Sequence, residues 1–248
     1  MHKKIAIISD IHSNSFALEA VLKDISARDI QLIVNLGDCL FGPVDPLGTA
    51  KSLMDNNKVI NIMGNCDEIL LHEHSNSETF KFVKPKLGRE IVEWIRSFNK
   101  TWVYEDLMFC HGTPYANDQY LLEDVQEYGV KYKSAEQLSM ELEEVSQKYL
   151  FCGHSHVFGL IYASNGKFVV NAGSVGLPAY KDSLPFPHIM ESKSPHANYV
   201  VAHRTLENNW NIEHVMVHYD WDKASSIAEA NGREDYAFAI KSGWAIVE

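Results

Sequence analysis

Short apolar runs alternate with polar segments along the first quarter of the chain. Residues 3–10, KKIAIISD, form a continuous isoleucine-rich run typical of a strand buried on both faces. Residues 13–28 then place apolar side chains at helical spacing, at Phe16, Ala17, Val21, Leu22 and Ile25. The same alternation repeats with a strand at 30–38, a helix at 45–57 and a strand at 58–65. Strand–helix repeats of this kind predict parallel strands joined by right-handed crossovers.

The rest of the chain predicts shorter elements. We expect helices at 86–98 and 134–147, the second opened by Ser134 and Gln137 at capping-box spacing. Further strands are predicted at 101–112, turning at Glu105 and Asp106, and at 148–156. Two hairpins are expected at 158–176, around Asn165-Gly166, and at 198–220, with one or two helices from about Trp221 to Trp244. Residues 177–197 hold four prolines and read as irregular, either a loop on the active-site side or a crossover connection.

Length and composition indicate one α/β domain over residues 1–248. Hydrophobic residues make up 46% of the chain, enough for a sizeable core, and no linker or repeat interrupts it. The net charge of −11 argues against binding nucleic acid or anionic membranes by broad electrostatic attraction. It leaves a phosphorylated substrate possible, since bound cations can supply positive charge locally. The oligomeric state is left open.

The chain start and the cysteines suggest the compartment. Residues 1–10 run directly into a strand without the long apolar region of a signal peptide, and no apolar run reaches the roughly 20 residues that span a bilayer. The four cysteines form no C-x-x-C pair and no disulfide framework. We therefore expect a cytoplasmic protein with reduced thiols.

Residues that bind metals stand at nearly every predicted strand end. These strand ends carry carboxylate, amide or imidazole side chains, at Asp10, His12, Asp38, Asn65, His111, His154 and His156. In open α/β sheets, sites form beyond the carboxyl ends of the strands. The pattern therefore predicts one metal site assembled from separate strands. Asn65 taken alone also fits a tight turn after a strand.

The ordered motifs DIH, GD, GN-x-D, HG and GHSH resemble the five-motif signature of calcineurin-like metallophosphoesterases, over residues 3–176. With NAGSVG at 171–176, the chain is similar to the small bacterial and archaeal phosphodiesterases of that superfamily, and to asymmetric diadenosine tetraphosphate hydrolases of Gram-positive bacteria. The resemblance implies a four-layer α/β/β/α sandwich of two mixed sheets flanked by helices. Residues 177–248 would complete or cap it, and we expect them to set substrate choice.

The resemblance also implies two divalent metal ions, of manganese, iron, zinc or cobalt, with manganese favoured. The first would be held by Asp10, His12, Asp38 and His156. The second would be held by Asp38, Asn65, His111 and His154, with Asp38 bridging the pair. Asp38, Asn65 and His111 are then the expected catalytic residues, and a water bridging the metals would attack phosphorus.

Cys66 departs from the Gly-Asn-His-Asp sequence of many members, in which the histidine lies near the leaving group. A thiol is a weak donor and an unlikely general acid. We therefore expect phosphodiesters or nucleotide phosphoanhydrides as substrates, diadenosine tetraphosphate among them. The alternatives are a phosphomonoesterase or protein phosphatase, and a non-catalytic scaffold like the retromer subunit of this fold.

Three residues are candidates for the substrate side of the site, namely Asn14, Cys66 and His72. Asn14 could instead cap the first helix, and His72 could be a solvated surface residue. Asp67 reads as structural, either capping the helix that follows or supporting a metal histidine. The other cysteines, Cys39, Cys110 and Cys152, are expected to pack in the core.

Overall fold

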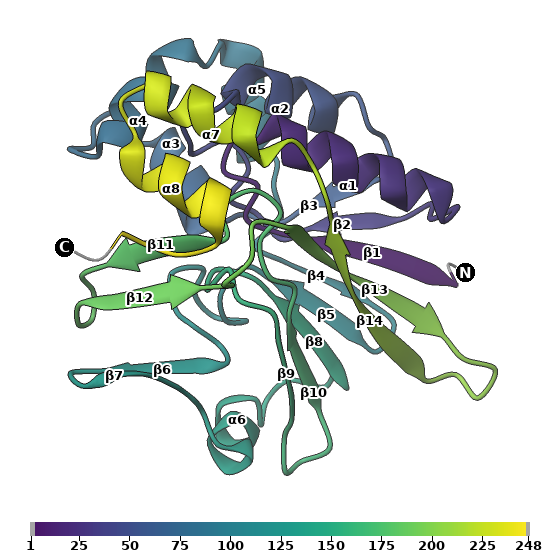
Figure 1. Cartoon of the computed structure of the whole chain (residues 1–248). Coiled ribbons are helices and arrows are strands. Elements are labelled where there is room, and N and C mark those ends of the chain that lie inside the picture. The colour runs from purple at the N-terminus through teal and green to yellow at the C-terminus, as the bar shows by residue number, and fades with distance from the viewer. Residues whose placement is uncertain (1–2, 247–248) are drawn as a thin grey trace.

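Two five-stranded sheets lie face to face in the computed structural model, which describes residues 3–246 (Figure 1). The first sheet has the order β14-β13-β1-β2-β3. Its strands are β1 (Lys4–Ile8), β2 (Ile33–Asn35), β3 (Val59–Asn61), β13 (Ala197–Arg204) and β14 (Trp210–Val217). The first three run parallel, whereas β13 is antiparallel to both β1 and β14, so the sheet is mixed.

The second sheet has the order β4-β5-β8-β10-β9. Its strands are β4 (Thr101–Tyr104), β5 (Leu107–Cys110), β8 (Tyr149–Cys152), β9 (Gly159–Tyr162) and β10 (Phe168–Asn171). The central three are parallel and the two edge strands antiparallel, so this sheet is mixed as well.

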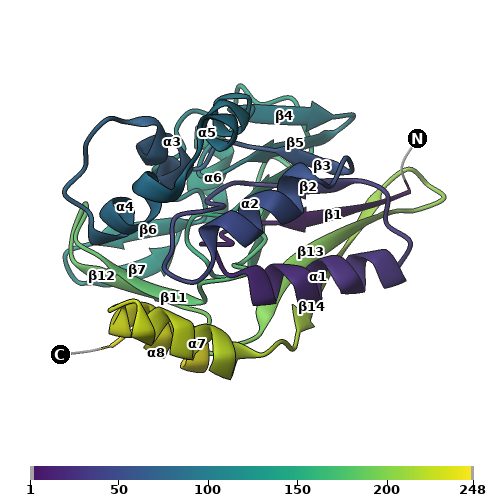
Figure 2. The ribbon, with the colours of Figure 1, turned by 90° about the horizontal axis from the view of Figure 1, so that it is seen from above.

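Helices cover the outer faces of both sheets and complete the four layers (Figures 1 and 2). The first sheet is covered by α1 (Ser15–Ala27), α2 (Pro46–Met54), α3 (Asn65–Leu71), α4 (Glu78–Val83), α5 (Arg89–Arg96), α7 (Trp221–Ala230) and α8 (Glu234–Ser242), with the short 3-10 helix η1 (Lys84–Lys86) after α4. The second sheet is covered by α6 (Ala135–Glu141) alone among the helices of the described residues, and its Ser134–Gln137 capping box is formed as predicted. The predicted four-layer α/β/β/α sandwich is confirmed.

The alternation of side chains along β1 shows how the layers are held together. Ile5 and Ile7 point between the sheets and pack in one cluster with Phe109 and Phe151 of the second sheet. Their neighbours on the strand point to the opposite face, toward the helices. A strand buried on both faces needs apolar residues at every position, which explains the continuous run in the sequence.

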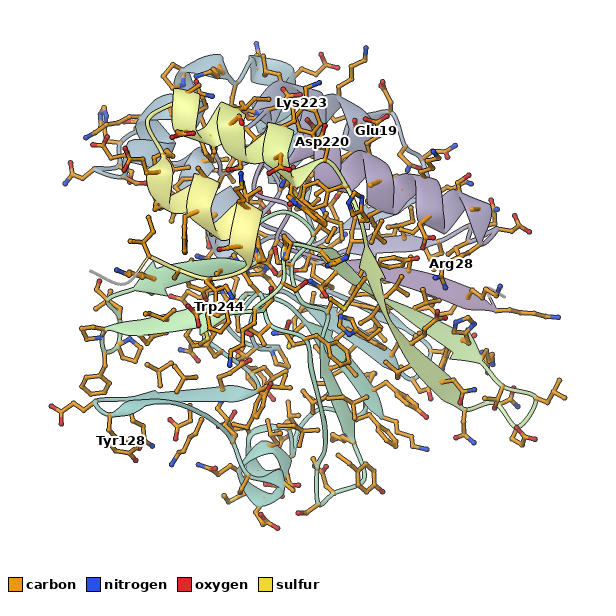
Figure 3. The ribbon with its side chains drawn as sticks, viewed as in Figure 1. Glu19, Arg28, Tyr128, Asp220, Lys223 and Trp244 are labelled. Atoms are coloured by element: carbon orange, nitrogen blue, oxygen red, sulfur yellow. The ribbon has the colours of Figure 1, made fainter. Side chains whose placement is uncertain are left out.

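An ion-pair network ties α1 to the edge of the first sheet. Arg28, labelled in Figure 3 at the end of α1, donates from Nη1 to Glu213 of β14 at 2.7 Å and from Nε to Asp24 at 2.7 Å. The hydrogen bond to Arg28, followed by that to His203, lowers the pKa of Glu213.

Two sequence predictions were wrong. Residues 177–197, expected to be irregular, contain the hairpin β11 (Ala179–Asp182) and β12 (His188–Glu191), which packs beside α8. The strand predicted to end at Asn65 ends at Asn61, because its neighbour β2 ends at Asn35, the residue paired with Asn61. A further hairpin, β6 (Glu123–Gln126) and β7 (Gly129–Tyr132), was not predicted either. No helix of residues 3–246 is long and apolar enough to span a bilayer.

Candidate metal centre

The seven expected ligands gather at one end of the two sheets. Asp10 and His12 follow β1, Asp38 follows β2, and His111 follows β5. His154 and His156 follow β8, and Asn65 is the first residue of α3. All of these side chains are buried except that of Asn65, which is partly exposed. Residues separated by up to 146 positions therefore meet in a single polar cluster.

The backbone at this cluster is held in a strained conformation. Five of the residues expected to be ligands have positive φ values of 45–68°, namely Asp10, His12, Asp38, His154 and His156. Such left-handed conformations cost L-residues of order 1–3 kcal/mol each and concentrate at functional sites. The loops are locked together by backbone hydrogen bonds, from Asp10 N–H to Gly37 at 3.0 Å and from His12 N–H to Asp38 at 2.9 Å.

Gly64 allows α3 to begin directly against Asp38. A Cβ atom on Gly64 would lie 2.0 Å from Asp38 Oδ1, a distance that no side chain could occupy. That same oxygen accepts a hydrogen bond from the Cys66 N–H at 2.9 Å. Asp38 Oδ1 is thereby fixed, and Oδ2 is left to face the other ligands.

Three histidines are oriented by backbone carbonyl groups. Each donates from Nδ1 to a carbonyl oxygen at 2.6–2.9 Å, His12 to Phe41, His111 to Leu36 and His156 to Leu177. A histidine held this way keeps a lone pair on Nε2, which is the arrangement usual for metal-binding imidazoles.

The free donor atoms converge around Asp38 and Asp10. Asp38 Oδ2 lies 3.7 Å from His12 Nε2 and 3.5 Å from His111 Nε2. Asp10 Oδ1 lies 3.4 Å from His156 Nε2 and 3.9 Å from His111 Nε2. Asp38 Oδ2 is therefore a near neighbour of both His12 and His111, and Asn65 Oδ1 lies 3.0 Å from His111 Nε2.

Two features of this cluster would be explained by a bound cation. The Nε2 atoms of His12 and His156 face each other at 3.1 Å, although both rings already use Nδ1 as the donor, so two lone pairs oppose each other. Asp10 Oδ1 is buried without a hydrogen-bond partner among the described residues. A divalent ion would satisfy both, and the carboxylate and imidazole donors suit manganese, iron, zinc or cobalt.

Metal binding requires neutral imidazoles and ionised carboxylates, and most of these ligands already meet that requirement. Burial, followed by repulsion from His156, lowers the pKa of His12. Burial and His111 lower the pKa of His154 to about 4. Burial alone would raise the pKa of Asp38, but the neighbouring His111 and His12 outweigh it and the pKa is lowered. His111 is the exception: burial would lower its pKa, but Asp38 and then Asp10 outweigh burial and raise it to about 9, so His111 would release a proton when a metal binds.

His154 is placed differently from the other histidines. Its ring stacks on Tyr120, with centroids 4.6 Å apart, and lies 5.3 Å from the ring of His111. Its backbone N–H donates to Asp10 Oδ2 at 3.1 Å. Among the described residues, the trios of donor atoms within 4.8 Å of one another are Asp10–His12–His156, Asp10–Asp38–His111 and His12–Asp38–Cys66. His154 thus borders the cluster without joining a trio.

Asp67 is a structural support of this centre. Its Oδ2 accepts from the N–H groups of Asp38 at 2.7 Å and Gly64 at 3.2 Å, and Oδ1 accepts from Cys39 at 2.9 Å. Burial and the charge of Asp38 raise the pKa of Asp67 to about 7, although the N–H donors oppose this rise. Asp67 caps the start of α3, as one alternative from the sequence had it. The same carboxylate holds the Asp38 loop, through backbone N–H groups and not through a metal histidine.

Two of the three substrate-side candidates lie away from the donors. Asn14 caps α1, accepting from Ala17 N–H, and its amide donates to Gly176 and Tyr219, so its side chain is buried and fully engaged. His72 is an exposed residue at the C-terminal end of α3 and does not line the cavity described next. Cys66 does line it.

A cavity of about 680 Å³ opens on the centre, and its far reaches are built from residues that sequence reasoning missed. Phe41, Asn65 and Cys66 line it beside the histidines, and β11 and α8 add Tyr180, Lys181, Arg233 and Tyr236. The ring of Tyr236 lies 6.4 Å from that of His12. No spacing in the sequence connects α8 with the ligand motifs, and only the fold brings them together.

The family of the chain follows from a sequence comparison. The family model of the calcineurin-like phosphoesterase superfamily domain matches residues 4–194. The chain therefore belongs to the calcineurin-like phosphoesterase superfamily, as its five motifs suggested. Members of this superfamily use divalent metals, in keeping with the donors assembled here.

Individual proteins also resemble this chain in sequence or in fold. An uncharacterised protein from Methanocaldococcus jannaschii is 29% identical over 245 residues, covering 89% of each chain. The metallophosphoesterase from Sphaerobacter thermophilus superposes with a TM-score of 0.76 at 21% identity, covering 98% of this chain and all of that one. A candidate diadenosine tetraphosphatase superposes with a TM-score of 0.54 at 13% identity, covering 88% of this chain and 95% of its own. These two structures share the fold.

Proposed function

We propose that this protein is a dinuclear metal-dependent phosphoesterase that hydrolyses phosphodiester or nucleotide phosphoanhydride bonds, with diadenosine tetraphosphate among the candidate substrates. The observation that carries the proposal is the position of Asp38, whose Oδ2 lies 3.7 Å from His12 Nε2 and 3.5 Å from His111 Nε2. A carboxylate close to two imidazoles can serve two cations at once.

We assign the donors to two sets that share Asp38. Asp10, His12 and His156 would hold the first ion with it, and Asn65, His111 and His154 the second. When bound, two such cations neutralise phosphoryl oxygens and lower the pKa of water enough to make it a nucleophile at neutral pH. These mixed imidazole and oxygen donors suit manganese, iron, zinc or cobalt, and among these four we favour manganese.

The residues around the donors fix the site and select the leaving group. The carbonyl-bound Nδ1 atoms keep the imidazoles aimed inward, so the ligands need little reorganisation on binding. Cys66 stands in the cavity next to Asn65, and burial followed by the charge of Asp38 raises the pKa of its thiol well above the ordinary value. A neutral thiol donates weakly, so leaving groups that depart without a proton should react best.

The alternative functions have less support. Phosphomonoesters with alkyl leaving groups need an acid, and the histidines that line the cavity among the described residues, His12, His154 and His156, are all assigned as metal ligands. A non-catalytic scaffold would not need a complete donor set, whereas here the orphaned oxygen of Asp10 is retained in a buried cluster.

A substrate panel tests this function. Metal-stripped protein would be supplied with Mn²⁺ and given bis(4-nitrophenyl) phosphate, 4-nitrophenyl phosphate, a cyclic nucleotide and diadenosine tetraphosphate. We expect the diester or the anhydride to be hydrolysed fastest. A clear preference for the monoester would contradict the leaving-group argument, and no Mn²⁺-dependent hydrolysis of any of the four would contradict the assignment as an enzyme.

A further inference from the structure

Arg233, the residue at the start of α8, brings a fixed positive charge into the same cavity as the metal ligands. Its guanidinium carbon lies 4.2 Å from the centre of the Tyr236 ring, and that ring lies 6.4 Å from the ring of His12. Arg233 is thus separated from the metal centre by one aromatic ring. The function proposed above does not use it.

The guanidinium is held rigidly by its neighbours. Nε donates to Asp235 Oδ1 at 2.9 Å and Nη2 to Asp235 Oδ2 at 2.7 Å, a bidentate pair. Nη1 donates to Thr79 Oγ1 on α4, and the hydroxyl of Tyr236 lies beside the group. Its side chain is 20% exposed, so it is neither a free surface arginine nor sealed in the core.

This arrangement leaves a hydrogen-bond donor for a ligand. An arginine offers five N–H bonds; Asp235 and Thr79 together take three and the Tyr236 hydroxyl is placed to take a fourth, which leaves at least one for a ligand. A guanidinium fixed in advance loses little side-chain entropy when it binds, and its planar fork matches the oxygens of a phosphate group.

We propose that Arg233 binds the non-reacting phosphate next to the one attacked at the metal centre, so that the preferred substrates are nucleotide phosphoanhydrides rather than simple diesters. This inference rests on the function proposed above and selects between its two substrate classes. The uncharged ester substituent of a simple diester would have no use for a cation at this place. A second phosphate, which is negatively charged, would be bound by this cation.

The charges along the cavity limit how many phosphates this subsite takes. Lys181 is the other cationic side chain among the described lining residues, and it is exposed on β11. Asp182 and Glu234 also line the cavity, and Asp235 already neutralises part of the charge of Arg233. The subsite therefore takes one phosphate beside the attacked one, and the acidic side chains offer no cation to a phosphate beyond it.

Arg233→Gln and Arg233→Lys test this assignment, with Arg96→Gln as the matched control. Arg96 lies on α5, pairs with Glu93 and does not line the cavity. For diadenosine tetraphosphate we expect Arg233→Gln to raise KM about 10-fold or more, the size expected for losing a hydrogen bond to a charged group. For bis(4-nitrophenyl) phosphate, which has one phosphorus, kcat/KM should change less than about 2-fold. Arg233→Lys keeps the positive charge but lacks the planar guanidinium. Its KM for diadenosine tetraphosphate should therefore lie between those of wild type and Arg233→Gln.

Equilibrium binding supplies a readout that does not depend on turnover. The affinity of the non-hydrolysable nucleotide α,β-methylene-ADP, measured by calorimetry, should fall about 10-fold in Arg233→Gln, whereas that of inorganic phosphate should be unchanged.

Equal losses on both substrates would show that Arg233 only packs α8 against α4, and unchanged kinetics with the anhydride would show that it does not meet the substrate. Either result overturns the proposal. Failure of the proposed function looks different, because wild-type protein would then hydrolyse neither substrate with Mn²⁺.

Discussion

Asp67 holds Asp38 in place through the backbone, accepting the Asp38 N–H at 2.7 Å on Oδ2. The same carboxylate accepts the N–H groups of Cys39 and Gly64, so one buried side chain joins the loop after β2 to the start of α3. The residue expected to bridge two metals is therefore placed by a group that is not among the expected metal ligands.

Replacing Asp67 should uncouple this support. Asp67→Ala leaves three buried N–H groups without acceptors, and each such loss costs about 1–3 kcal/mol. We expect the free energy of unfolding of the metal-free protein, measured in urea, to fall by about 3 kcal/mol, and affinity for Mn²⁺ to fall as well. Glu68→Ala, at the exposed next position of α3, is the control. A value within 0.5 kcal/mol of wild type for Asp67→Ala, the usual range for surface substitutions, would contradict this role.

Asp38→Asn should abolish hydrolysis. The substitution keeps the size of the side chain but removes the charge that would serve both cations, and an amide is a weaker ligand than a carboxylate. We expect kcat on bis(4-nitrophenyl) phosphate to fall by at least about 1,000-fold while the circular dichroism spectrum is retained. Activity within 10-fold of wild type would rule out a bridging role for Asp38.

Cys66→Ala should leave most of the activity. The thiol is neutral and a weak donor, so removing it takes little from the reaction of a good leaving group. On bis(4-nitrophenyl) phosphate, we expect kcat/KM within about 3-fold of wild type. Complete loss of activity in a folded Cys66→Ala protein would mean that the sulfur takes part in metal binding or catalysis. Its place in a trio of donor atoms with His12 and Asp38 would then be the reason.

Glu123 should make the protein less stable as the pH rises. Burial raises its pKa from 4.5 to about 7, with Ser155 opposing the rise through a 2.6 Å hydrogen bond. Between these two values the folded protein keeps a proton that the unfolded chain has released, so the free energy of unfolding falls as pH rises through this window and levels off above pH 7.

Glu123→Gln removes this titration. The difference in unfolding free energy between Glu123→Gln and wild type should therefore shift in favour of the variant by up to about 3 kcal/mol between pH 5 and pH 8. Urea unfolding of metal-free protein measures it, with Glu144→Gln, an exposed acid, as the control. The same difference at both pH values would show that Glu123 does not titrate in this range.

The sequence predicted the parts of the fold that local pattern controls. The isoleucine run of β1 reflects a strand buried on both faces, and the helical spacing of α1 reflects a helix buried on one face. Both elements lie where they were predicted. The hairpin at 179–191 was missed, because prolines and polar residues conceal two short strands that are half exposed. Asn65 was placed at a strand end, although Gly64 turns the chain and α3 begins at Asn65.

The candidate donors were predictable from the sequence as far as they stand just after strands. Asp10, Asp38 and His111 could be found this way, because the carboxyl ends of parallel strands meet at one edge. Arg233 and Tyr236 could not, because their place in the cavity depends on how α8 packs on the finished fold. The support given by Asp67 was visible only as an acidic residue two positions after Asn65.

The number of metal ions that the protein binds tests the central claim most directly. Calorimetric titration of metal-stripped protein with Mn²⁺, followed by assay of each titrated sample, gives the stoichiometry and its link to hydrolysis. A carboxylate shared by two donor sets predicts that two ions bind per chain, that hydrolysis appears only as the second site fills, and that Asp38→Asn loses both properties. Full activity with a single bound ion, or with none, would contradict a dinuclear centre at Asp38.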